Sequence, residues 1–171
     1  MEAKMEKTLK PKLKPGDIHV IINDWESKYI GEAKAYDATG KLLWKIPALC
    51  KGIEGARWSV RNGDTPPGLY LAGELFVTQP GESNQIWSAY GQNCIDLVEQ
   101  ENQETRYNRG GICWHGGGSA APDPLADQQQ LVPTLGCVRS HNGDLKKIVV
   151  PLLQALNAKG DRMWITVNQI D

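Results

Sequence analysis

The sequence contains no apolar run long enough to cross a bilayer, which excludes a membrane-spanning helix. Such a helix needs about 20 consecutive, mostly apolar residues, and no segment of this 171-residue chain approaches that length. Residues 1–15 also lack the apolar centre of a secretory signal peptide. We expect residues 1–16 to be a flexible basic segment, followed by a single domain over residues 17–171. The lysines of the basic segment are Lys4, Lys7, Lys10, Lys12 and Lys14.

The chain also lacks an excess of positive charge. Its formal net charge is −1, and it carries neither an arginine-rich stripe nor an aromatic RNA-binding motif. Nucleic-acid binding depends largely on basic side chains that contact phosphates. The composition therefore argues against nucleic acid as a partner.

Cysteine is scarce, and its spacing is not that of a disulfide framework. The four cysteines are Cys50, Cys94, Cys113 and Cys137, without the tight, even pattern of a small disulfide-bonded domain. If Cys137 acts as a nucleophile it must be free. Three cysteines then remain, so at least one other is also a free thiol, as expected of a small buried hydrophobe.

The residues that point to chemistry are His115, followed by three glycines, and the segment Thr134-Leu135-Gly136-Cys137-Val138-Arg139. A free cysteine has a pKa of about 8.5, and a neighbouring imidazole lets a thiolate–imidazolium pair form. Gly136 permits a tight turn that exposes the sulfur and directs amide N–H groups at a developing oxyanion. Arg139 offers a planar fork of donors suited to a carboxylate.

These motifs resemble the L,D-transpeptidase family, peptidoglycan-crosslinking enzymes with a YkuD-type catalytic domain. Its signature is a histidine, a variable loop, and then Ser/Thr-x-Gly-Cys-Val/Ile-Arg/Asn, and this chain departs from it only at the variable position, Leu135. Residues 118–133, predicted to be a loop, make the spacing slightly longer than is usual. Residues 36–43 and 64–70 resemble the family's early hairpin and its T-P-x-G-x-Y segment. The match spans roughly residues 18–150.

The resemblance implies a two-step acyl transfer on peptidoglycan stem peptides. Cys137 would be the nucleophile and His115 the base, with the second imidazole nitrogen oriented by the carbonyl of Gly116. An amine, such as a second stem peptide or a D-amino acid, would then release the thioester. We expect a monomer without cofactor or metal, located in the cell envelope, in the periplasm or outside the cell. Export would need a signal removed from this chain or another secretion route.

Other motif residues have two interpretations each. Thr134 sets the turn or binds substrate, and Arg139 grips a substrate carboxylate or steadies the active-site loop. Gly136 and Val138 are expected to contribute amides to the substrate site. His141 is the alternative base. Aromatic residues that could line a groove, or lie buried instead, are Trp58, Trp87, Trp114, Tyr90 and Tyr107.

Three alternative functions remain. The same site could hydrolyse its thioester and act as an L,D-carboxypeptidase. A zinc-stabilised binding module could use Cys113, His115, Cys137 and His141, although these lack the tight Cys-x2-Cys spacing. A catalytically silent wall-binding module would need a lost nucleophile, yet Cys137 is present.

The pattern of hydrophobic residues predicts a mainly β fold, with a β-sandwich or barrel-like sheet of YkuD type and one main C-terminal helix. Strands are expected at residues 18–22, 33–36, 42–46, 69–72, 75–78, 111–115 and 163–167. The polar segment 92–109 is expected to be a short helix or a lid. Asn142 is expected to cap the C-terminal helix, Pro151 to kink or restart it, and Gly160 to end it.

Overall fold

The computed structural model describes residues 9–55, 57–78 and 84–171. The predicted basic segment therefore lies partly outside the described residues, since residues 1–8, with Lys4 and Lys7, are not among them. Residues 9–16 contact the domain at several places: the Leu9 amide donates to Glu101 Oε1 at 3.2 Å, and Leu13 lines a pocket with His19 and Ile21. Within the described residues, no helix combines the length and the apolar character needed to span a bilayer.

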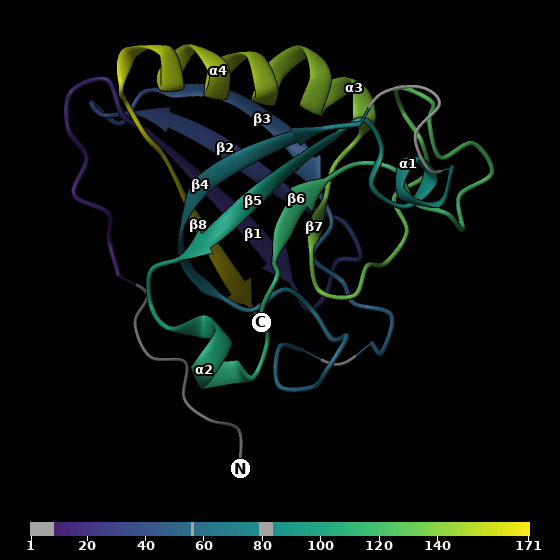
Figure 1. Ribbon diagram of the computed structural model, residues 1–171. Coiled ribbons are helices and arrows are strands. Elements are labelled where there is room, and N and C mark those ends of the chain that lie inside the picture. The colour runs from purple at the N-terminus through teal and green to yellow at the C-terminus, as the bar shows by residue number, and fades with distance from the viewer. Residues whose placement is uncertain (1–8, 56, 79–83) are drawn as a thin grey trace.

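The described strands form one sheet that curves into a nearly closed barrel (Figure 1). Its order is β3-β2-β1-β8-β4-β5-β6-β7, with β1–β8 and β6–β7 parallel and the other pairs antiparallel. Isolated bridges from Leu49 to Arg139 and from Gly52 to Thr134 join the end of β3 to the β7 side. The strands are β1 Ile18–Trp25, β2 Gly31–Asp37, β3 Leu42–Ala48, β4 Gly68–Val77, β5 Asn93–Glu99, β6 Cys113–His115, β7 Val138–Arg139 and β8 Met163–Ile170.

One long helical run packs across this sheet and closes the core. It begins with α3 (Asn142–Asp144), continues through the π-helical segment η1 (Leu145–Val149), and ends with α4 (Val150–Lys159). The shorter helices α1 (Asn84–Tyr90) and α2 (Gln103–Tyr107) lie elsewhere around the sheet. The predicted fold class, a mainly β barrel-like sheet with one main C-terminal helix, is confirmed.

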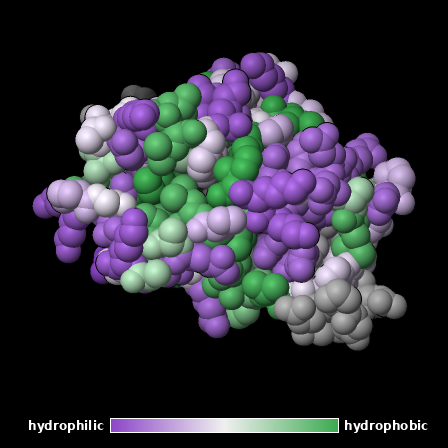
Figure 2. Space-filling model, turned by 90° about the horizontal axis from the view of Figure 1, so that it is seen from above, coloured by the Kyte–Doolittle hydropathy of each residue, from purple (hydrophilic) through white to green (hydrophobic). Residues whose placement is uncertain are grey.

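The apolar stripe of the helical run is the face that meets the sheet. Leu145, Val149, Leu153 and Leu156 belong to the buried core together with residues of the central strands. Burying a leucine or valine side chain stabilises a fold by about 1.5–3 kcal/mol. Figure 2 views the molecule from this helical side, where hydrophilic and hydrophobic residues are interleaved on the outer surface.

Three local predictions need correction. The two strands expected at 69–72 and 75–78 form the single strand β4, because a bulge between Ala72 and Leu75 keeps it continuous past Gly73. The polar segment 92–109 does contain an expected short helix, α2, but it begins with the strand β5, which was not expected and whose Ile95 and Leu97 are buried in the core.

The third correction concerns Asn142, which does not cap its helix. The N-cap is His141, and the Asn142 side chain makes its hydrogen bonds elsewhere.

Pro151 lies in the first turn of α4, directly after the π-helical segment. Its missing N–H donor is therefore accommodated by a change of helix type. Gly160 ends the run in the left-handed region, as predicted, with φ of +73°.

Candidate active site

The turn before Cys137 is built by the hydroxyl of Thr134. Thr134 Oγ1 accepts the Gly136 N–H at 2.9 Å and donates to the Cys137 carbonyl oxygen at 2.8 Å. Thr65 Oγ1 also donates to the Cys137 carbonyl, at 3.3 Å. Thr134 thus makes the contacts of a turn-forming residue.

This turn limits which amides are available for an oxyanion. The Gly136 amide, expected to face substrate, is already bonded to Thr134. The Val138 side chain is fully buried in the core, and the residue pairs with Trp114 in the sheet. The Cys137 amide has no acceptor among the residues that the structure describes. The Cys137 amide is therefore free to bind an oxyanion.

A buried arginine, Arg109, which the sequence analysis did not name, supports the turn before Cys137. Arg109 is 6% exposed, and its guanidinium donates to five backbone carbonyls. Its Nη2 atom donates to Gly63 at 2.9 Å and to Leu135 at 3.3 Å, so it joins the loop before β4 to the turn before Cys137. The remaining acceptors, all of Nη1, are Trp58, Val60 and Asp64.

We expect Gly136→Ala to destabilise the protein by about 3 kcal/mol, the sum of backbone strain and overpacking. Gly136 has φ of +123°, and an added Cβ would lie 2.0 Å from Arg109 Nη2. Gly40→Ala is the matched control, because Gly40 has φ of +89° with nothing within 4 Å. Urea unfolding should show the control losing only the strain, about 1–2 kcal/mol. Equal losses would mean that Arg109 does not confine this turn.

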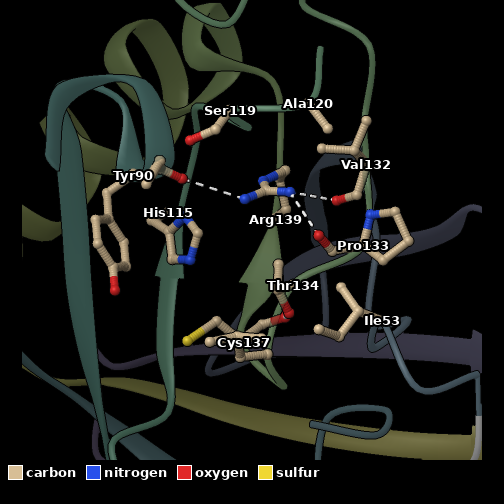
Figure 3. Close-up of a pocket in the computed structure, with 12 residues that line it drawn as sticks. Ile53, Tyr90, His115, Ser119, Ala120, Val132, Pro133, Thr134, Cys137 and Arg139 are labelled. Atoms are coloured by element: carbon tan, nitrogen blue, oxygen red, sulfur yellow. Dashed lines mark hydrogen bonds between the residues drawn. The ribbon is translucent and has the colours of Figure 1, made fainter. Parts of the chain in front are cut away.

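His115 lies beside the sulfur of Cys137 and is held by its own neighbouring carbonyl (Figure 3). Its Nδ1 atom is 2.8 Å from the Gly116 oxygen, which also accepts Arg139 Nε at 3.2 Å. A carbonyl partner requires the proton on Nδ1, which leaves Nε2 as a proton acceptor. The Tyr90 ring packs edge-on against the imidazole, with centroids 4.7 Å apart. The imidazole is thus oriented without a carboxylate.

A second cysteine lies directly beside Cys137. The parallel register pairs Trp114 with Val138, which sets Cys113 opposite Cys137, and the Cys113 amide donates to Cys137 Sγ at 3.3 Å. The pKa of Cys137 is raised to about 12 by its hydrogen bond with the Cys113 thiol and by burial, against the opposing influence of His115.

This raised pKa corrects the expectation of a preformed thiolate. At neutral pH the resting Cys137 is a neutral thiol, so an imidazole would have to take its proton while the sulfur attacks. His115 is in position for that transfer.

Removing the neighbouring thiol should make Cys137 more reactive. In Cys113→Ala, the hydrogen bond that most raises the pKa of Cys137 is lost, so the pKa should fall. Because the thiolate is the reactive form, iodoacetamide should label Cys137 faster at pH 8 than in the wild type. Rates are measured by peptide mass spectrometry across a pH series. Cys94→Ala is the control, and equal acceleration in that variant would contradict this account.

Arg139 is used as a structural clamp. It is 5% exposed, and its donors go to backbone carbonyls of Gly116, Ala89, Val132 and Pro133. These contacts join β7 to α1 and to the long loop 118–133. These contacts support the predicted role of Arg139 in steadying the loop, and its grip on a substrate carboxylate stays a prediction.

His141 and the zinc alternative find little support in the geometry. His141 Nδ1 lies 3.5 Å from Asp144 Oδ2 at the start of the helical run. Over residues 9–55, 57–78 and 84–171, no group of three or more His, Cys, Asp or Glu side chains is arranged to hold a metal ion.

The glycine segment after His115 is held by Asn142. Asn142 Oδ1 accepts the Gly117 amide at 2.9 Å, and its Nδ2 donates to the carbonyls of Pro124 and Ala126. A Cβ on Gly116 would lie 2.1 Å from Asn142 Oδ1, so only glycine fits there. Sequence reasoning named Asn142 as a helix cap and missed this role.

Two cavities meet at Cys137. One, of about 270 Å³, lies on the His115 side. The other, of about 510 Å³, lies on the side of α2 and the loop before β4 and is more polar. Tyr90, Leu135 and Cys137 line both. Further residues of the first cavity include Ile53, Ala120, Val132 and Pro133, and those of the second include Ser59, Arg61, Asn62, Tyr107 and Asn108.

Of the aromatic residues that could line a groove, some are buried in the core and others line the cavities. Trp114 is fully buried, and its Nε1 donates to Ser140 Oγ at 2.9 Å. Trp58 packs edge-on against Tyr107, with ring centroids 6.2 Å apart. Only Tyr90 and Tyr107 among these aromatics line the cavities at Cys137.

Comparison with known proteins identifies the fold. Neither a protein-family model nor a curated protein matches the chain. Among solved structures, the chain is similar to the helical cell shape determining protein Pgp2 from Campylobacter jejuni, with 18% identity and a TM-score of 0.54 over 91% of this chain and 49% of Pgp2. It is also similar to Bd1075 from Bdellovibrio bacteriovorus, with 17% identity and a TM-score of 0.52 over 93% of this chain and 54% of Bd1075.

At these identities the likeness concerns the fold alone. The chain spans about half the length of each of these two proteins. The fold of this chain therefore corresponds to about half of each of these two longer proteins.

Proposed function

We propose that the protein is a cysteine acyltransferase that acts on peptidoglycan stem peptides by L,D-transpeptidation. The observation that carries this proposal is the arrangement of Cys137, His115 and Gly116 where two cavities meet. The similarity to L,D-transpeptidases in the Cys137 motif supports the substrate class. The fold shared with a cell-shape determining protein is consistent with it. This function would place the protein in the cell envelope or periplasm, or outside the cell.

In the first step Cys137 Sγ attacks the amide carbonyl that joins diaminopimelate to a terminal D-residue. His115 Nε2 takes the thiol proton, and the Cys137 amide donates to the oxyanion. Such a donor contributes about 2.7–4 kcal/mol in comparable sites. Collapse of the tetrahedral intermediate breaks the C–N bond, and His115 returns the proton to the departing amine.

In the second step an amine attacks the thioester, with His115 as base, and the Cys137 thiol is released. Two cavities at one sulfur suit this scheme, since the acyl donor and the amine acceptor can approach from different sides. If water attacks instead, the same intermediate yields L,D-carboxypeptidase activity. The polar cavity around Arg61 and Asn62 is the observation that favours this second function.

The test is incubation with purified disaccharide-tetrapeptide, with and without D-methionine, read by mass spectrometry. Exchange with D-methionine or formation of a crosslinked dimer supports transpeptidation. Tripeptide alone under both conditions makes the protein a carboxypeptidase. Unchanged tetrapeptide, from folded protein with a reactive Cys137, contradicts the proposed substrate class.

A further inference from the structure

Three thiols lie in a row on one face of the sheet beside the candidate active site. In antiparallel pairing Cys94 lies opposite His115, and Cys113 and Cys137 directly precede Trp114 and Val138, which pair in the parallel register of β6 and β7. Residues two apart on a strand share a face, so Cys113 and His115 point the same way. Cys113 lies between the other two: its amide donates to Cys137 Sγ at 3.3 Å, and the neighbouring Cys94 raises the pKa of the Cys113 thiol. The proposed acyl transfer uses Cys137 alone and gives no role to Cys113.

We propose that Cys113 is a resolving thiol for Cys137, so that oxidation by a peroxide converts the pair into a reversible disulfide. Formation of this disulfide depends only on the geometry of the two thiols. Its consequence, reversible loss of turnover, rests on the proposed function.

The spacing of the two residues suits this bond. Neighbouring strands lie about 4.8 Å apart, within the range of about 4.4–6.8 Å for Cα atoms joined by a disulfide. The contact of Cys137 Sγ with the Cys113 amide, at 3.3 Å, shows that the sulfur already lies over the partner residue. Both side chains are partly exposed, so a small oxidant can reach them.

The other cysteines are less suitable. Cys50 is 1% exposed, so an oxidant in solution cannot reach its thiol. Cys94 lies on β5, one strand beyond Cys113, so its direct neighbour among the thiols is Cys113 rather than Cys137.

The chemistry balances with hydrogen peroxide as the oxidant. Cys137 Sγ attacks one peroxide oxygen and the O–O bond breaks. His115 relays the thiol proton to the departing hydroxide, giving a sulfenic acid and one water. The Cys113 sulfur then attacks the sulfenic sulfur, the S–O bond breaks, and a second water leaves with the Cys113 proton. The peroxide is reduced by two electrons, which the two thiols supply.

Trypsin provides a direct readout of this bond. The chain has no lysine or arginine between Arg109 and Arg139, so one tryptic peptide, residues 110–139, contains Cys113 and Cys137 and no other cysteine. After peroxide treatment and alkylation without reduction, this peptide should appear unalkylated and lacking two hydrogens. A Cys94–Cys113 bond would instead join it to the peptide 62–106.

The variant Cys113→Ala separates a resolving role from simple proximity. In the wild type, dithiothreitol should restore free Cys137 and iodoacetamide labelling almost completely. In Cys113→Ala, the sulfenic acid has no resolving partner and should proceed to sulfinic and sulfonic acid, which dithiothreitol does not reverse. Cys94→Ala is the matched control, and it should behave like the wild type.

Two results would overturn the inference: a Cys94–Cys113 bond as the main product, or equal irreversible oxidation of Cys137 in wild type and Cys113→Ala. Because mass and labelling are measured without peptidoglycan, these results are independent of the proposed function. A protein that forms the Cys113–Cys137 disulfide but leaves the tetrapeptide unchanged retains the redox site and loses the substrate assignment.

Discussion

Cys137→Ala should reduce turnover of disaccharide-tetrapeptide by about 10⁴-fold or more, because no covalent intermediate can form. The expected products, exchanged or crosslinked stem peptides, should fall to background in a mass-spectrometric assay. The fold should persist, since Thr134, Thr65 and Arg109 hold the backbone of this turn, while the substitution removes the longer contacts of the sulfur with the Cys113 amide and the Gly111 carbonyl. The free energy of unfolding, measured by thermal denaturation, should therefore change by about 1 kcal/mol or less.

A covalent probe makes the same prediction independent of the natural substrate. The resemblance to L,D-transpeptidases implies acylation by carbapenems, so the wild type should gain one adduct in intact-mass spectra. Cys137→Ala should gain none, whereas Cys94→Ala should be acylated like the wild type. An adduct or measurable turnover in folded Cys137→Ala would end the assignment of Cys137 as nucleophile.

The parts of the site that could be predicted are those carried by local sequence. Gly136 before Cys137 indicates a tight turn, and Thr134 two residues before the glycine has the short hydroxyl side chain that such turns use. The apolar residues from Leu145 to Leu156 recur with a period of 3.6 residues. Over that length this spacing predicts unambiguously which face of the helix is buried.

The parts that could not be predicted depend on contacts between distant segments. Arg109 ends a polar segment and resembles any exposed arginine, yet its acceptors lie 26 to 51 residues away in the chain. The pairing of Cys113 with Cys137 requires the register of two short parallel strands. The alternation of Ile95 and Leu97 did indicate a strand, but the acidic and amide residues that follow obscured it.

The raised pKa of Cys137 has the same origin. Sequence reasoning placed an imidazole near the thiol and therefore expected a lowered pKa. The structure adds Cys113 and burial, whose combined influence exceeds that of His115. The base is consequently more important for this thiol than for one that is already ionised.

His115→Gln should slow acylation of Cys137 by about 10²–10⁴-fold, the usual contribution of a general base. Glutamine is similar in size and can still donate to the Gly116 carbonyl, but it cannot accept the thiol proton. The rate is measured as carbapenem adduct formation at pH 7. His141→Gln is the matched control, because His141 pairs with Asp144 and is not the partner of the sulfur. Comparable losses in both variants would contradict the role of His115.

The pH dependence should distinguish a lost base from a merely displaced loop. With the pKa of Cys137 at about 12, the thiolate fraction rises about tenfold per pH unit below that value. Acylation of His115→Gln should therefore climb steeply between pH 7 and pH 10, while the wild type, assisted by its base, changes less. A displaced loop would lower the rate equally at every pH. Adding His115→Gln to Cys137→Ala should cause no further loss of turnover, because the two residues act in one step.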